Sequence, residues 1–335
     1  MISIPMGPGV WSFQVLKKNA FGDIEMMTIY KTAGNELETI DRPSKGSWVN
    51  LVDPSADELR QTAQDLDIDP EMLRFSMGQE AISSVKKVDD TLRILIRIPY
   101  HQAAEANVPY ITLPLGIVLT KDLVITVCRE EVDLFQDLDD AHREDLATDK
   151  PRRFVLHMLL SNANAYLRFL NDIYQSVDRL EEHLVGALQN REVLELLRYQ
   201  KSLVYFMTGL EFNGMMLDRL QRAELLDLKP ADADLVDDVV TENLEAQKMV
   251  ENASNILSQM MAAFSSIISN NLNVVMKFMA AITVILIIPQ IVGAFYGMNV
   301  GLPIENHSLA FLIIVGLSFL MAAVVAWIFR KKNWM

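Results

Sequence analysis

The sequence predicts an α/β cytosolic domain, a long stalk helix and two C-terminal transmembrane helices. The segments Phe278–Phe295 and Leu309–Phe329 are almost wholly apolar, and at 1.5 Å rise per residue each approaches the thickness of a hydrocarbon core. The stretch 231–288 contains neither proline nor glycine, which is typical of one long helix leading into the first apolar segment. The first 135 residues instead contain short segments rich in Val, Ile, Thr and aromatic residues, which are typical of strands.

Residues 1–150 are the predicted α/β domain. Its strands are expected at Val10–Leu16, Met26–Tyr30, Ser47–Leu51, Thr91–Ile98, Tyr110–Thr120 and Leu123–Cys128. Ser55 follows Asp53 and Pro54 and predicts a helix start, because a serine side chain can cap free backbone amides. The sequence contains no phosphate-binding loop, dinucleotide-binding fingerprint or zinc-protease motif, so no enzymatic activity is expected.

The remainder divides into helical segments. Residues 151–230 predict a helical hairpin that begins at Pro151 and breaks near Gln189–Arg191, and a second break is expected at Leu228–Pro230. The predicted parts that follow are the stalk helix 231–272, the first transmembrane helix 273–299, the outer loop 300–308, the second transmembrane helix 309–329 and a basic tail 330–335. A helix from 231 to 295 would be about 95 Å long, which exceeds a globular element and indicates a stalk that enters the membrane.

Charge predicts the orientation and limits the partners. Lys277 precedes the first span and Arg330, Lys331 and Lys332 follow the second, whereas the loop between the spans has no Lys or Arg. Lys and Arg are retained on the cytoplasmic side, so we expect a multi-pass inner (plasma) membrane protein with both termini cytoplasmic. The net charge is −14, which makes nucleic acid an unexpected partner. One cysteine excludes an intrachain disulfide, and the first residues do not resemble a secretory signal.

A heptad seam of small and polar residues follows the first span. The seam consists of Asn273, Met276, Ala280, Thr283, Ile287, Gln290 and Ala294. Asn and Gln are costly in lipid unless they face protein or water, so this seam predicts either a pore lining or polar contacts between packed helices. Two helices cannot enclose a water-filled path, and a pore would therefore require several chains around an axis.

The sequence Tyr296-Gly297-Met298-Asn299, placed between two C-terminal spans, resembles the signature of the CorA family of divalent-cation channels. The basic, Trp-containing end 330–335 and the segment Trp48–Pro54 are also similar to that family. The resemblance implies a funnel-shaped homopentamer in membrane lipid, with the stalk continuous with the pore helix. It implies Mg²⁺ as substrate and as regulatory ligand, with no other cofactor.

The resemblance also assigns roles in the pore. Tyr296, Gly297, Met298 and Asn299 would form a selectivity filter. A ring of Asn299 side chains suits a hydrated ion, because Mg²⁺ gives up its water reluctantly. Hydrophobic constrictions can gate by dewetting, and the candidate gate residues are Met276, Met279 and Ile287. The membrane potential would drive entry.

Two acidic pairs are candidates for regulatory metal binding. Asp237 and Asp238 lie on the predicted stalk, and Asp89 and Asp90 lie in the α/β domain. Family members place such sites between the stalk of one subunit and the α/β domain of the next, which predicts that cytosolic Mg²⁺ bridges subunits and closes the pore. The alternative is that these are solvated surface carboxylates.

The outer loop departs from the family pattern and leaves the ion open. Family members often carry Pro-Glu-Leu after the signature, whereas here Glu305 alone can supply an anionic ring. His307 could favour Co²⁺, Ni²⁺ or Zn²⁺ over Mg²⁺, or be a solvated loop residue. The alternatives are therefore a transition-metal transporter of the same fold and a non-conducting, membrane-anchored interaction protein.

Overall fold

The computed structural model of the protein describes residues 27–34, 36–78, 81–102, 106–184, 190–298, 301, 308–332 and 334. Of residues 181–184 and 190–192 it describes the backbone alone. The predicted strand Val10–Leu16 lies outside these ranges. The chain forms two compact units, residues 1–257 and 258–335, and each is considered by itself.

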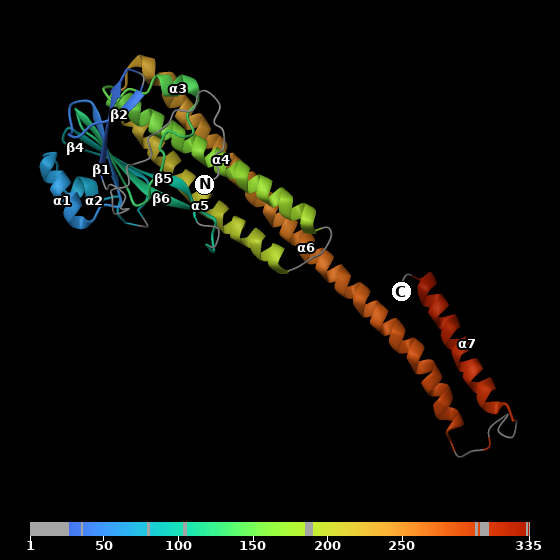
Figure 1. Cartoon of the computed structure of the whole chain (residues 1–335). Helices are drawn as coiled ribbons and strands as arrows, with labels where there is room; N and C mark the ends of the chain where they lie inside the picture. The colour runs from blue at the N-terminus through green and yellow to red at the C-terminus, as the bar shows by residue number, and fades with distance from the viewer. Residues whose placement is uncertain are drawn as a thin grey trace. The chain divides into compact units, whose positions relative to one another are not determined.

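A mixed seven-stranded sheet with the order β2-β1-β3-β7-β6-β5-β4 forms the centre of the first unit (Figure 1). Its strands are β1 (Met27–Ala33), β2 (Glu36–Thr39), β3 (Ser47–Val52), β4 (Ser84–Val88), β5 (Thr91–His101), β6 (Tyr110–Leu119) and β7 (Leu123–Cys128). Neighbours pair antiparallel, except that β3 and β7 are parallel with Val49 opposite Ile125. This parallel pair joins the N-terminal strands to the hairpins that follow.

Five of the predicted strands are confirmed, and the sequence analysis missed the two strands at the edges of this sheet. Strand β2 is four residues long with the sequence ELET, and β4 has the sequence SVKKV. Short length and charged side chains protect an edge strand from pairing with other chains. The same features weaken the apolar alternation from which a strand is recognised.

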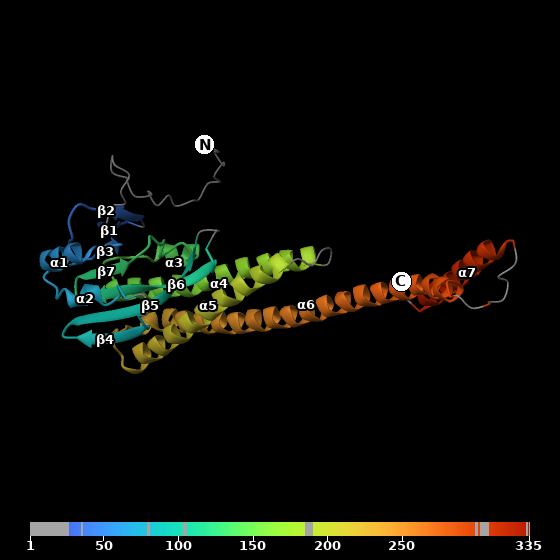
Figure 2. The same ribbon diagram turned by 90° about the horizontal axis from the view of Figure 1, so that it is seen from below.

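Helices cover both faces of the sheet (Figures 1 and 2). One face carries α1 (Ala56–Asp65) and α2 (Glu71–Arg74), which bury Leu59, Ala63 and Leu73 against β3 and β7. The other face carries α3, α4, α5 and the start of α6, and its core includes Trp48, Phe135 and Phe154. These helices are α3 (Asp140–Glu144), α4 (Pro151–Leu184), α5 (Asn190–Arg222) and α6 (Ala233–Tyr296), the last preceded by a 3₁₀ turn, η1 (Pro230–Asp232).

The helix boundaries agree with the signals in the sequence. The Ser55 hydroxyl accepts a hydrogen bond from the Glu58 amide at 3.3 Å, and the Glu58 carboxylate accepts one from the Ser55 amide at 2.7 Å. This capping box satisfies backbone donors at the start of α1. Helix α4 begins at Pro151 as expected, because proline at the first helical position sacrifices no hydrogen bond.

Asn213 of α5 forms hydrogen bonds to β5 at the point where the pairing of β5 with β4 ends. The β4–β5 pairing runs only as far as Leu95, so Arg97 of β5 lies beyond the last β4 partner. The Arg97 amide donates to Asn213 Oδ1 at 2.8 Å, and Asn213 Nδ2 donates to the Arg97 carbonyl at 2.8 Å. The Ser83 hydroxyl donates to the same Asn213 oxygen at 2.7 Å. One buried amide therefore replaces the missing strand partner.

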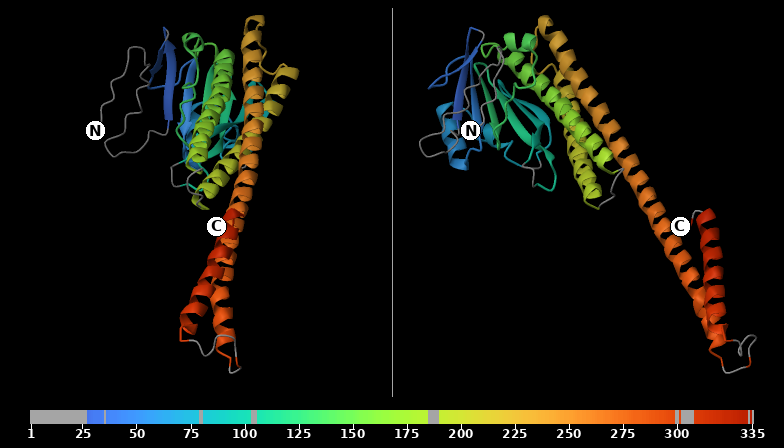
Figure 3. Two further views of the ribbon diagram at one scale, coloured as in Figure 1. Left: turned by 90° about the vertical axis from the view of Figure 1, so that its right-hand side faces the viewer. Right: turned by 45° about the vertical axis from the view of Figure 1, so that its right-hand side comes forward.

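The second unit is a pair of apolar helices. The 64-residue helix α6 continues through Pro289, and α7 (Ala310–Lys331) lies alongside its C-terminal part (Figure 3). Both helices are long and apolar enough to cross a membrane. Within this unit Ala281, Ser318 and Ala322 are buried, and such small residues allow close helix approach.

Candidate functional site

The predicted pore residues of α6 share one exposed face. All seven are exposed in the single chain: Asn273, Met276, Ala280, Thr283, Ile287, Gln290 and Ala294. The buried or half-buried positions of the same stretch are Ala281, Ile282, Ile285, Ile288, Pro289, Val292 and Tyr296. At about 100° per residue the centres of the two sets lie roughly 180° apart around the helix. The hairpin thus covers the opposite side of α6 and leaves the polar seam uncovered.

Thr283 shows how a seam residue can present an acceptor. Its hydroxyl donates to the Met279 carbonyl at 2.8 Å, one turn earlier on the same helix. The hydroxyl proton is thereby used inside the helix, and the oxygen keeps lone pairs for a donor from outside. Coordinated water around a cation is such a donor.

The three candidate gate residues are also exposed in the single chain. The exposed fractions are 68% for Met276, 64% for Met279 and 40% for Ile287. Large exposed apolar side chains in this number indicate a surface that contacts lipid or other protein chains. Further toward the N-terminus the seam stays exposed at Asn252, Asn255, Gln259, Ala262, Ser266 and Ser269.

The signature lies partly within the described residues. Tyr296 is the last residue of α6, and the amide of Gly297 donates back to the Gly293 carbonyl at 2.9 Å. The amide of Met298 donates to the Phe295 carbonyl at 3.3 Å, so the helix ends in a turn. Asn299, Glu305 and His307 lie outside the described residues, and their predicted roles stay predictions.

The acidic candidates lie on different elements of the first unit. Asp89 and Asp90 form the turn between β4 and β5, with Asp89 at φ 52°. Asp237 and Asp238 are exposed on the first turns of α6. Within the described part of one chain, no group of three or more His, Cys, Asp or Glu side chains is arranged to hold a metal ion.

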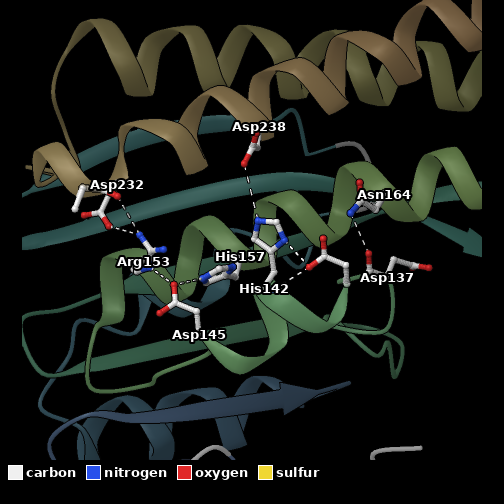
Figure 4. A network of polar contacts seen from close by, with 10 residues as sticks. Asp137, His142, Asp145, Arg153, His157, Asn164, Asp232 and Asp238 are labelled. Atoms are coloured by element: carbon white, nitrogen blue, oxygen red, sulfur yellow. Dashed lines mark hydrogen bonds and ion pairs between the residues drawn. The ribbon is translucent and has the colours of Figure 1, made fainter. Parts of the chain in front are cut away.

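Asp238 has a neighbour that the sequence analysis missed. His142 on α3 lies with Nε2 3.9 Å from Asp238 Oδ2 and with Nδ1 2.7 Å from Asp139 Oδ1 (Figure 4). The His142 amide, donating to Asp139, is the main cause that lowers the pKa of Asp139, the cap of α3. No periodic pattern in the sequence relates His142 to Asp238, because the two lie on different elements.

The same cluster continues into the interior at His157. This residue is fully buried on α4, and burial lowers its pKa to about 4, so the ring is neutral near pH 7. Its Nε2 lies 3.5 Å from Asp145 Oδ2. Arg153 forms ion pairs with Asp145 and, at 2.7 Å, with Asp232 in η1, directly before α6 (Figure 4).

Farther along α6 the carboxylates influence one another. The pKa of Glu242 is raised, first by burial and then by the neighbouring negative charges of Glu245 and Asp238. The start of α6 therefore carries a stripe of acidic groups that repel one another, which a bound cation would relieve.

Comparison with known proteins gives consistent matches. The family model described as CorA-like Mg²⁺ transporter protein matches residues 44–331. The cobalt/magnesium transport protein CorA of Methanocaldococcus jannaschii is 25% identical over 297 residues, which is 86% of this chain and 90% of that protein. Its namesake from Thermotoga maritima is 21% identical over 224 residues, 66% of this chain and 64% of that protein.

Solved structures agree in fold. The complete CorA magnesium transporter from Methanocaldococcus jannaschii has a TM-score of 0.77 at 22% identity, covering 93% of this chain and all of that one. The full-length CmaX protein has a TM-score of 0.67 at 14% identity, covering 92% and 98%. Identity this low shows the fold alone. With the α/β unit, the long helix and two apolar helices on one chain, and a family model matched over most of its length, the chain belongs to the CorA-like Mg²⁺ transporter family.

Proposed function

We propose that the protein is a homopentameric channel that conducts hydrated Mg²⁺ across the inner membrane. The observation that carries this proposal is the uncovered polar face of α6, which lies opposite the face that the hairpin buries. In a bilayer this face requires protein or water as its neighbour. Copies of α6 around an axis would supply both.

The chemistry of the seam fits a hydrated ion. Mg²⁺ holds its water tightly, and the waters of a hydrated ion are hydrogen-bond donors. The seam offers acceptors in the side chains of Asn273, Thr283 and Gln290 and, among the described residues of 273–298, no carboxylate. Rings of neutral oxygens can hold the hydrated ion without stripping it. Asn299 would provide the outermost ring, with Tyr296, Gly297 and Met298 shaping the filter.

Apolar side chains on and beside the seam would control opening. Met276 and Ile287 in the seam, with Met279 beside it, would exclude water when copies of these side chains approach each other. With both termini cytoplasmic, an inside-negative potential draws a doubly charged ion inward by roughly 4 to 5 kcal/mol per 100 mV. Transport then needs no nucleotide.

Regulation would act through the acidic start of α6. In the proposed pentamer, Mg²⁺ bound between Asp237 or Asp238 of one subunit and Asp89 or Asp90 of the next would hold neighbouring subunits in the closed state. Burial raises the pKa of Glu242 first, and the negative charges of Glu245 and Asp238 raise it further; a cation bound at this surface would offset the second of these causes.

The principal alternative concerns which ion is transported. Two relatives bear the name cobalt/magnesium transport protein, so Co²⁺, with Ni²⁺ and Zn²⁺, competes with Mg²⁺ as the substrate of this chain. Glu305 and His307 of the outer loop would contribute to the ranking.

Ion flux in proteoliposomes tests the proposal. We expect Mg²⁺ uptake that increases with an imposed inside-negative potential and is abolished by Asn299→Ala, while Gln221→Ala, at an exposed position of α5 outside the seam, leaves uptake near the wild-type rate. Parallel assays with Co²⁺, Ni²⁺ and Zn²⁺ rank the ions. Flux restricted to Zn²⁺ would identify a transition-metal transporter, and no flux with any ion would favour a non-conducting interaction protein.

A further inference from the structure

The end of the hairpin where α6 enters and α7 leaves the apolar segment is basic. Lys277 precedes the apolar part of α6, and Arg330, Lys331 and Lys332 end α7. The short connection between the helices places these residues at the same end of the second unit. Residues 258–335 contain one acidic residue, Glu305, and it belongs to the connection at the opposite end.

These four cations have no carboxylate partner within the described part of the chain. Lys331 lies over an aromatic ring instead, with its Nζ 5.4 Å from the centre of the Trp327 ring. Arg330 and Lys332 are exposed. A concentration of unpaired positive charge at a membrane boundary requires anions from outside the unit.

Aromatic rings surround the same position. The chain turns back after α7, where the Trp334 amide donates to the Phe329 carbonyl at 3.0 Å. Trp334 stacks on Phe329 with ring centres 5.4 Å apart and planes within 6°. Trp327 remains 63% exposed and Trp334 39% exposed. Indole rings prefer the region between hydrocarbon and water, so this turn holds the basic residues at the level of lipid headgroups.

We propose that this basic-aromatic end, defined as Lys277, Trp327, Arg330, Lys331, Lys332 and Trp334, binds anionic phospholipid. The guanidinium of Arg330 matches a phosphate with paired N–H donors, and Lys332 adds a second positive charge next to it in the sequence. A zwitterionic lipid also brings a positively charged ammonium group to this surface, so it should bind more weakly than an anionic lipid. The exposed indoles contact the glycerol and upper acyl region.

Aromatic exposure favours lipid over the other available anions. Residues 1–257 are acidic overall, so carboxylates of another subunit could also neutralise the basic residues. Such an ion pair would leave Trp327 and Trp334 without a matching surface, whereas a phospholipid supplies both the phosphate and the apolar contact. This inference rests on the proposed membrane insertion of α6 and α7, and it is independent of ion conduction.

Fluorescence quenching by brominated lipids tests the proposal on the full-length chain without any measurement of flux. The chain has four tryptophans, of which Trp48 is buried in the first unit. We expect brominated phosphatidylglycerol to quench several-fold more effectively than brominated phosphatidylcholine at the same mole fraction. The variant with Trp327→Phe and Trp334→Phe should lose this lipid-dependent part of the signal.

Charge variants separate specific binding from general insertion. Arg330→Gln with Lys332→Gln should bring the ratio of the two lipids close to one. Lys201→Gln, a change of charge at an exposed position of α5, should preserve the ratio. Raising the salt concentration on the wild-type chain should reduce the preference as well, which provides a test if the double variant does not insert.

Three results would overturn the proposal. Equal quenching by the two lipids in the wild-type chain would mean that another subunit or bulk ions neutralise the basic end. Loss of the preference on adding inorganic phosphate at constant ionic strength would assign the surface to soluble anions. A preference that survives both the charge variants and high salt would place lipid selection elsewhere. Absence of ion flux with a retained lipid preference would contradict the channel and leave this inference intact.

Discussion

The two units differ in whether their polar side chains form hydrogen bonds within the chain or stay exposed. In the first unit, the buried amide of Asn213 forms its hydrogen bonds within the same chain, with Arg97 and Ser83. In the second unit, polar seam residues such as Asn273 and Gln290 remain exposed on α6. The first unit therefore holds this amide by hydrogen bonds within the chain, whereas the second unit leaves the side chains of its seam accessible from outside.

This difference predicts that stability and transport depend on different sets of residues. Changes at satisfied positions should alter the free energy of unfolding, and changes at the exposed seam should alter flux with little effect on folding. Substitutions that produce the reverse pattern would contradict the assignment of the two units.

The largest effect is expected from Asn213→Ala. The change removes the acceptor that Asn213 offers to the Arg97 amide and to the Ser83 hydroxyl, whereas the Arg97 carbonyl keeps the Tyr166 hydroxyl as a donor at 3.1 Å. Each buried unsatisfied group costs about 1 to 3 kcal/mol. We expect a loss on the order of 4 kcal/mol, measured by chemical denaturation of the full chain in detergent. Asn255→Ala, an exposed position on α6, is the matched control and should change stability by less than about 0.5 kcal/mol. Equal losses in both variants would remove the distinction between the units.

A pH dependence of similar size is expected from His157. Its pKa lies at about 4 in the folded chain and near 6.5 in the unfolded chain, so the unfolded state takes up a proton first as the pH falls. Stability should be complete above pH 6.5 and fall by about 3 kcal/mol on the way to pH 4. Asp145 offsets part of the cost of charging the ring, and Arg153 and His142 add to it.

The variant His157→Phe tests this assignment. Phenylalanine keeps an aromatic ring and cannot be charged, so the fall in stability between pH 6.5 and pH 4 should shrink by most of that amount. Denaturation curves of both chains at pH 7, 5.5 and 4.5 measure the change. An unchanged slope would mean that other groups cause the acid sensitivity.

We expect Thr283→Val to reduce flux about tenfold, which corresponds to about 1.4 kcal/mol. The substitution keeps the shape of the side chain and removes the acceptor oxygen that the hydroxyl presents. The melting temperature should not change, because the side chain is exposed and its hydrogen bond lies within its own helix. Thr241→Val, an exposed position in the first unit, should leave flux unaltered. Full activity in Thr283→Val would argue against a pore face at this position.

The smallest effect is expected from Asp238→Asn. Loss of one carboxylate should weaken inhibition of flux by cytosolic Mg²⁺ two- to threefold, a modest change because Asp237 remains beside it. Flux titrations with Mg²⁺ on the cytoplasmic side measure the shift, and Asp234→Asn, also exposed on α6, is the control. Inhibition identical to that of the wild-type chain would place regulation elsewhere.

Local signals in the sequence were sufficient for most of the fold. The capping serine before α1, the proline at the start of α4 and the uninterrupted stretch of α6 each depend on neighbours in the chain, and each was predicted. The edge strands β2 and β4 were missed because their polar sequences lack an alternating pattern.

Contacts between distant elements could not be predicted in the same way. The approach of His142 to Asp238 and the insertion of Asn213 beside β5 depend on how α3, α5 and α6 pack. The seam of α6 was predictable because helical periodicity alone defines a face. That this face lies opposite the hairpin contact required the structure.

The parallel pairing of β3 with β7 has a consequence for biosynthesis. Trp48 Nε1 donates to Thr126 Oγ1 at 2.8 Å across these two strands, although the residues are 78 positions apart in the chain. The sheet therefore cannot form completely until β7 has left the ribosome. Such distant pairing is slow compared with the formation of a helical hairpin. Both apolar segments follow β7 in the chain, so every strand of this sheet is synthesised before the helices of the second unit emerge.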